Sequence, residues 1–157
     1  MKTLQIEESK ARTLYKSASS EFKTMLEDTF GKGFFSQKVT ERIKTYEDAC
    51  RELNINPIDE TTLTSNGFTK DEIVYRKIKT ITEALNEGWQ ANWNDENQNK
   101  WTPYFYPNSP SGFVFYDTDY GYSDAVAAYG VRLCFKSDEL ATYAGKQFVD
   151  LYKEFIL

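Results

Sequence analysis

The stretch TKDEIVYRKIKTITEALNEG, residues 69 to 88, contains the clearest helix pattern in this chain. Thr69 and Glu72 have the spacing of a capping box, in which each side chain bonds the backbone N–H of the other residue. Gly88 is suited to end the helix. We therefore expect a long amphipathic helix with one apolar stripe, because four apolar residues recur at intervals of three and four; these are Val74, Ile78, Ile81 and Leu85.

Helix signals also dominate the residues before this stretch. In TYEDACRELNI, Thr45 and Asp48 resemble a second capping box, and Asn54 can end that helix in the left-handed conformation. Pro57 prevents an easy restart of the helix. We expect helices over 7–16, 20–30, 36–44 and 45–53, and then a polar connector over 56–68.

The character of the chain changes after residue 88. From Trp101 to Tyr122, nine of 22 residues are aromatic, and prolines and glycines interrupt them. PYFY, GFVFY and YGVRLCF are typical of short strands separated by turns. In YGVRLCF, strict alternation predicts one face with Val131, Leu133 and Phe135 and an opposite face with Arg132, Cys134 and Lys136.

A final helix is expected after these strands. Ser137 is a suitable N-cap, and apolar residues at helical spacing extend to Phe155. Gly145 inside this helix indicates a close approach, most simply to a strand, because Gly is otherwise unfavourable there. The predicted class is α+β: a helical N-terminal half (1–88), then a small antiparallel β-sheet covered by a C-terminal helix (89–157), in a single compact domain over 1–157.

Composition excludes several chemistries. The chain has 157 residues, a net charge of −5, two cysteines and no histidine. Without histidine there is no Ser-His or Cys-His catalytic couple, and two cysteines are too few for a structural zinc site. We expect no cofactor. No apolar run approaches the ~20 residues that a membrane helix needs, and the N-terminus lacks a secretory signal, so the expected location is the cytoplasm.

Three blocks carry a resemblance: IKTYEDACREL, DEIVYRKIKTITEALNEGW and RLCFKSDELATYAGKQFVDLYKEF. They resemble an uncharacterised protein family encoded by phages and prophages of gut Bacteroidales. The resemblance covers about Ile43 to Phe155 and implies a phage or prophage origin and a shared fold, but no activity. Between the last two blocks, FVFYDTDYGYSDAVAAYG is more acidic than the family's versions, so a function on its acidic residues would belong to this member alone.

All three tryptophans lie in a polar run, WQANWNDENQNKW, residues 89 to 101. Aromatic rings beside amides and carboxylates suit a sugar, a nucleobase, a cationic ligand or a protein partner. The alternative is that the rings are core. We expect Trp89 to close the long helix onto the core, and Trp93 and Trp101 to lie nearer the surface. The expected ligand-binding residues are Trp93, Asn94, Trp101, Tyr104, Tyr106, Tyr116 and Tyr120.

Three further sites are weaker candidates. Asp117, Asp119 and Asp124 around Gly121 could hold Ca²⁺, but the EF-hand pattern is not met, and an acidic hairpin turn is the favoured explanation. The same carboxylates could serve a glycoside hydrolase. Cys134 between two cations could be a reactive thiol, although burial is the commoner state for Cys.

Charge disfavours nucleic acid as a partner. Residues 1–88 are nearly neutral, whereas residues 89–157, which hold the candidate stacking rings, are acidic. Nucleic-acid binding requires cations for the phosphates. The leading hypothesis is a non-catalytic accessory protein that binds a host protein or a small polar ligand through an aromatic, acidic surface. The alternatives are a virion-associated or glycan-contacting protein, and then a carboxylate-dependent hydrolase. The sequence does not indicate the oligomeric state.

Overall fold

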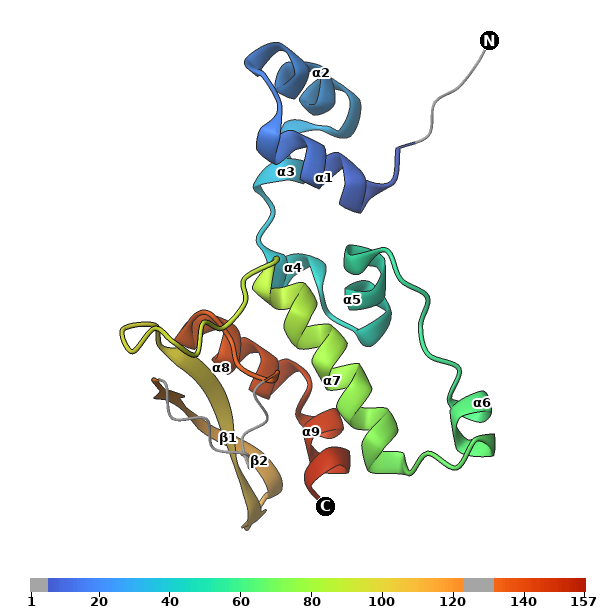
Figure 1. Ribbon diagram of the computed structural model, residues 1–157, viewed down its shortest axis with the longest axis vertical. Helices are drawn as coiled ribbons and strands as arrows, with labels where there is room; N and C mark the ends of the chain where they lie inside the picture. Colours follow the sequence, from blue (N-terminus) through green and yellow to red (C-terminus); the bar gives the residue numbers. More distant parts are fainter. Residues whose placement is uncertain (1–5, 123–131) are drawn as a thin grey trace.

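The computed structural model describes residues 6–122 and 132–157. Within these residues it contains nine helices and a two-stranded antiparallel sheet, which confirms the α+β class with a helical first half (Figure 1). The elements are α1 (Glu8–Ser17), α2 (Ser20–Phe30), α3 (Lys32–Ser36), α4 (Val39–Arg42), α5 (Tyr46–Leu53), α6 (Glu60–Ser65), α7 (Lys70–Asn86), β1 (Lys100–Ser109), β2 (Gly112–Gly121), α8 (Asp138–Gln147) and α9 (Val149–Ile156).

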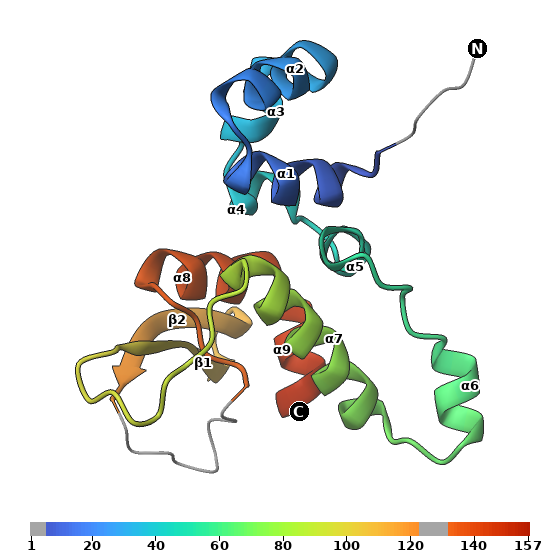
Figure 2. The same ribbon diagram turned by 45° about the horizontal axis from the view of Figure 1, so that its top comes forward.

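Helices α1, α2 and α3 form a group of their own at one end of the molecule (Figures 1 and 2). Gly31 ends α2 with a φ of 88°. Tyr15 stacks on Phe35 with 4.1 Å between ring centroids, and Phe30 and Phe34 complete the cluster. The helix expected over 36–44 is shorter, because Ser36 ends α3 and only Val39–Arg42 continues as α4.

Capping explains both the predicted helix α5 and the unexpected helix α6. Thr45 N donates to the Asp48 carboxylate at 2.9 Å, Asp48 N donates to Thr45 Oγ1 at 3.1 Å, and Asn54 has the left-handed φ of 54°. The connector over 56–68 contains α6, where Asp59 accepts two N–H groups of the first turn. Sequence periodicity misses α6 because its cap, and not an apolar stripe, marks it.

Helix α7 runs through the middle of the fold, packed on α5 on one side and α9 on the other (Figure 1). Thr69 N donates to the Glu72 carboxylate at 2.8 Å, which confirms the capping box. Glu87, with a φ of 50°, is the left-handed C-cap and precedes Gly88. The predicted stripe is buried to 2% exposure or less; its members are Val74, Ile78, Ile81 and Leu85.

Strands β1 and β2 form a hairpin with two register shifts, one in mid-strand and one between Tyr106 and Ser109, close to the turn. Tyr104 pairs with Asp117, and the next residue, Phe105, pairs with Phe115, so Tyr116 is an extra residue in a β-bulge. Trp101, Pro103 and Phe105 of β1 share one face with their partners on β2. That face meets the C-terminal helices, as shown by the 4.8 Å between the ring centroids of Phe105 and Tyr152 on α9.

The segment before α8 departs from the predicted strand. Within residues 132–137, only Phe135 bridges to β1, through N–H···O bonds of 3.0 and 2.8 Å with Trp101. Leu133, Cys134 and Phe135 are all buried, which overturns the predicted alternation of Cys134 and Lys136 on one exposed face. Asn86 causes this, because its side chain bonds the backbone of Cys134 and Lys136. Val131 lies outside the described residues.

The C-terminal helix is divided in two. Ser137 caps α8 as predicted, but Phe148, with φ −113° and ψ 28°, separates α8 from α9. The predicted close approach at Gly145 is real, although side chains and not backbone make it. A Cβ there would lie 2.7 Å from Cε2 of Phe115 and 2.9 Å from Cβ of Pro103.

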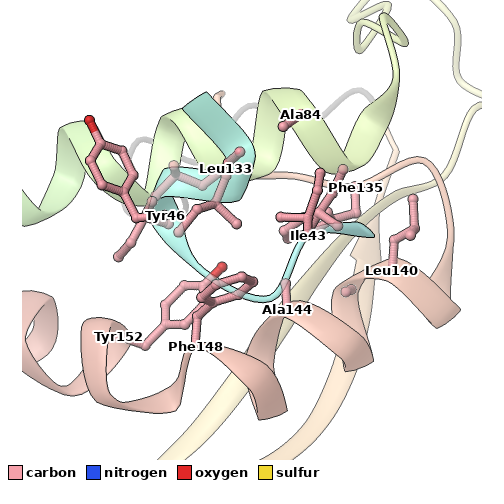
Figure 3. Close-up of a cluster of buried hydrophobic side chains, with 14 of the residues drawn as sticks. Ile43, Tyr46, Ala84, Leu133, Phe135, Leu140, Ala144, Phe148 and Tyr152 are labelled. Atoms are coloured by element: carbon pink, nitrogen blue, oxygen red, sulfur yellow. The ribbon is translucent and has the colours of Figure 1, made fainter. Parts of the chain in front are cut away.

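One hydrophobic core joins the elements on both sides of residue 88. In Figure 3, Ile43 from the chain after α4, Phe135 from the segment before α8 and Ala144 of α8 converge beside α7. All three are fully buried. Rings that are only partly buried pack around this core, Trp101 among them. No helix within residues 6–122 and 132–157 is long and apolar enough to cross a membrane.

Candidate binding surfaces

The hairpin presents a face of tyrosines on the side opposite the helices. We call this the tyrosine face; it comprises Thr102, Tyr104, Tyr106, Val114, Tyr116, Asp117 and Asp119. Tyr106 and Tyr116 are 47% and 57% exposed, and their ring centroids are 4.1 Å apart. A hydrogen bond between the two raises the pKa of Tyr106. Two carboxylates and no cation lie on this face, so it is aromatic and acidic.

A second aromatic group lies at the far end of the hairpin from its turn. Trp101 and Tyr120 are paired across the strands, with 4.7 Å between ring centroids. Tyr122 meets Tyr120 edge-on at 5.4 Å. Tyr120 and Tyr122 are 40% and 49% exposed. The group therefore extends from the core out to the surface.

The polar residues around the tryptophans organise a loop, residues 88–99, which we call the Trp loop. The Asn92 side chain accepts from Asn94 N at 3.0 Å, and the Gln98 side chain accepts from Asn92 N at 2.6 Å. The Asp95 side chain likewise accepts from Asn97 N at 2.9 Å. These amides and carboxylates replace the backbone bonds that a loop lacks.

A buried lysine supports the Trp loop from within. Lys100 is only 2% exposed, and its ammonium donates to the carbonyl of Asp95 at 2.9 Å. The ammonium also lies 5.5 Å from the ring centroid of Trp93, within the range of a cation–π contact. Together, the carbonyl and the ring offset part of the cost of removing this cation from water.

A cavity of about 420 Å³ lies between the Trp loop, the last turns of α7 and the segment before α8. The half-buried rings of Trp89 and Trp93 line it, and Lys79 and Arg132 add positive charge. Its remaining lining residues are Thr82, Glu83, Asn86, Gly88, Gln90, Ala91 and Cys134.

The predicted ligand-binding residues do not form one site. The tyrosine face holds Tyr104, Tyr106 and Tyr116, whereas the far end of the hairpin holds the pair Trp101 and Tyr120. The cavity is lined by Trp93. Asn94 is exposed on the Trp loop and does not line the cavity. All three tryptophans are half-buried, which agrees with the partial exposure expected for Trp93 and Trp101, but Trp89 is not among the rings packed against the core. Trp101 packs against the core, whereas Trp89 lines the cavity with Trp93. Trp101 contacts the core because it lies on the face of β1 that meets the C-terminal helices.

The carboxylates proposed for a metal bond their own strand. Asp117 Oδ1 accepts from Thr118 N at 2.9 Å, and Asp119 Oδ1 accepts from Tyr120 N at 2.8 Å. Asp124 lies outside the described residues. Within the part of the chain that the structure describes, no cluster of three or more Cys, Asp or Glu side chains could hold a metal ion.

Both cysteines are buried. Cys50 lies in the core, as predicted from its helix face. Burial raises the pKa of the Cys134 thiol, against a smaller opposing effect of Lys100. A raised pKa disfavours the thiolate, so burial supports the alternative of an unreactive cysteine over activation of Cys134 by Arg132 and Lys136.

A larger cleft, of about 950 Å³, separates α1 from α4 and α5. Its main cation, Arg42, is neutralised by Glu52 at 2.7 Å and Glu87 at 3.1 Å, and Lys136 reaches Glu87 at 3.3 Å. Burial opposes ionisation of Glu87, but the hydrogen bonds from Arg42 and Lys136 outweigh it and lower the pKa of this carboxyl. These four charges therefore neutralise one another within the fold.

The sequence analysis missed Lys79 and Arg132 as parts of a site. A signal for the first was present: Lys79, Thr82, Glu83 and Asn86 recur at helical spacing on the side of α7 away from its apolar stripe. Arg132 had no such signal, because the fold brings it there from another segment. Comparisons with models of protein families, with curated proteins and with solved structures find no match to this chain.

Proposed function

We propose that the protein is a non-catalytic binding protein that engages a protein partner through the tyrosine face. One observation carries the proposal: Tyr106 and Tyr116 form an exposed ring pair on a strand face that the helices leave open. Tyrosines are favoured as interface anchors, because a large ring with two rotatable bonds buries much area at little entropic cost. Core packing explains the inward rings of the hairpin but not these.

The charge of the face indicates the chemistry of the partner. Asp117 and Asp119 lie beside the tyrosines, and the hairpin from residue 101 to 122 contains no Lys or Arg. A partner with a basic surface would complement it, and such complementarity accelerates association. Because the chain resembles phage-encoded proteins, we propose a protein of the bacterial host as this partner. Among the described residues no helix covers this face, and Tyr106 and Tyr116 are exposed on it, so a macromolecule fits it better than a small ligand does.

Site-specific photo-crosslinking tests this proposal. A photoreactive phenylalanine analogue replaces Tyr116 in one variant and Met25, which is 53% exposed on α2, in a control variant. Both are expressed in a Bacteroidales host and irradiated. We expect one host protein to crosslink through position 116 and not through position 25. The double variant Tyr106→Ala/Tyr116→Ala should then fail to bind that purified protein while its melting temperature stays unchanged.

The other outcomes decide against the proposal. Equal crosslinking from positions 25 and 116 would indicate random collision. Labelling of phage structural proteins alone would favour the virion role, and carbohydrate adducts alone would favour a glycan-contacting role, in which the same rings stack on sugar faces.

A further inference from the structure

The cavity beside the Trp loop is a second candidate site, and none of its lining residues belongs to the tyrosine face. Its volume of about 420 Å³ lies within the roughly 300–1,000 Å³ of small-molecule sites. Thr82, Asn86 and Cys134 form a buried floor, each 5% exposed or less. The site therefore has the depth that the open tyrosine face lacks.

The cavity carries positive charge on an acidic protein. Lys79 and Arg132 both line it. Within the described ranges, 6–122 and 132–157, neither cation has a hydrogen bond or an ion pair, and Lys79 does not pair with Glu83 one turn along α7. With one acid against two cations, this lining is net positive, whereas the whole chain has a charge of −5. Elsewhere, cations such as Arg42 are neutralised by carboxylates.

The indole walls are available for a ligand. Among the residues that the structure describes, neither Trp89 nor Trp93 packs on another aromatic ring, although most rings of the hairpin do. Trp93 is held in place by Lys100, which does not itself line the cavity. An indole that is fixed in advance loses little freedom when a planar ring stacks on it.

We infer that this cavity binds a small planar aromatic molecule that carries an anionic group, either phosphate or carboxylate. The ring of the ligand packs against the indoles, and the anion lies between Lys79 and Arg132. Gln90 and Glu83 offer an amide and a carboxylate to the polar edge of the ring. A single anion suffices here, so the acidic character that disfavours nucleic-acid polymers is no obstacle. The inference stands independently of any partner at the tyrosine face.

NMR of the indole N–H groups tests this inference, because the chain has three tryptophans and so three such signals. Trp→Phe variants assign them. The probes are adenosine 5′-monophosphate and 2-naphthoate, which represent the two anions, with adenosine and inorganic phosphate as controls. We expect either probe to shift the signals of Trp89 and Trp93, with Trp101 as internal reference. Adenosine and phosphate should bind at least about tenfold more weakly than the nucleotide.

Charge variants provide the second readout. Lys79→Gln and Arg132→Gln should each weaken binding of the responding probe at least about fivefold. Lys32→Gln, an exposed cation on α3, should leave it unchanged. A response to one probe alone shows which of the two ring-and-anion combinations the cavity accepts. The inference is overturned if no probe moves Trp89 and Trp93 at about 5 mM, if adenosine binds as tightly as its monophosphate, or if Lys32→Gln weakens binding as much as Lys79→Gln. None of these results bears on crosslinking at Tyr116.

Discussion

Asn86 takes the place of a strand neighbour for the segment around Cys134. Its Nδ2 donates to the carbonyl of Cys134 at 2.9 Å, and its Oδ1 accepts from the N–H of Lys136 at 3.0 Å. An adjacent strand would satisfy these two groups with its backbone. Here one buried side chain at the end of α7, 4% exposed, does so across 48 residues of sequence. It fixes the chain that leads into α8 and the floor of the cavity.

Replacement of this amide by an acid should destabilise the fold strongly. In Asn86→Asp the donor to Cys134 is lost, and a carboxylate faces a carbonyl in a buried site. We expect a loss of about 2–3 kcal/mol in the free energy of unfolding at neutral pH, measured by urea denaturation. The loss should shrink in acid, because the carboxyl group of the variant, once protonated, can again donate to that carbonyl. Asn97→Asp, on the exposed part of the Trp loop, should change stability little. A penalty independent of pH would contradict this account.

Gly145 should not tolerate even one methyl group. The Cβ of Gly145→Ala would meet Phe115 at 2.7 Å and Pro103 at 2.9 Å, so the hairpin must shift from α8. We expect a loss of about 1–3 kcal/mol, although Ala is the better helix former. Gly33→Ala in α3 is the matched control, because nothing lies within 4 Å of its new Cβ. Thermal denaturation should show a lower melting temperature for the first and an equal or higher one for the second. Equal melting temperatures would show that the packing of α8 on the hairpin is loose.

Glu87 should make stability depend on pH. Its folded pKa is lowered by Arg42 and Lys136, so its contribution is present above the unfolded pKa of about 4.3 and is lost as pH falls through the folded pKa. Glu87→Gln should cost about 1 kcal/mol at pH 7, and the gap from the wild type should close in acid. Glu139→Gln removes an exposed pair with Lys38 and should cost almost nothing. Urea denaturation between neutral and acidic pH measures both gaps; a Glu87→Gln gap that widens in acid would rule out this ion pair.

The tryptophans should differ in their contribution to stability. Trp101→Ala removes a ring that packs against the core and on Tyr120, and we expect a loss of about 3 kcal/mol or more. Trp89→Ala removes a ring that lines an existing cavity, so the loss in the free energy of unfolding should stay below about 1 kcal/mol. Chemical denaturation of both variants gives the comparison. The reverse order would restore the burial pattern expected from the sequence.

Local signals predicted most of the fold correctly. Capping boxes begin α5 at Thr45 and α7 at Thr69, and Gly31 ends α2. These features depend on residues at most three or four positions apart, so the sequence alone contains them. Long-range contacts caused the errors. Cys134 is buried in a segment whose backbone Asn86 bonds, and Trp101 lies on the face of β1 that packs against helices distant in sequence. The hydrophobic periodicity of the sequence does not indicate either of these contacts.

The two candidate binding surfaces also differ in how far local sequence signals predict them. The tyrosines of the hairpin could be placed on one face because alternation along a strand is local. The bulge at Tyr116 and the register shift between Tyr106 and Ser109 were unforeseen. The cavity could not be predicted, because it joins the end of α7, the Trp loop and Arg132 from three separate segments.

The bulge in β2 has an evolutionary consequence. Tyr116 has no partner on β1, so deletion of this single codon would leave every strand pair on either side in register. Deletion of Thr118, two residues further along β2, would instead move each side chain in the rest of the strand to the opposite face of the hairpin. The fold thus places little selective constraint on the most exposed ring of the hairpin, at 57%. Persistence of an aromatic residue at that position among relatives would reflect selection for what the residue meets outside the molecule.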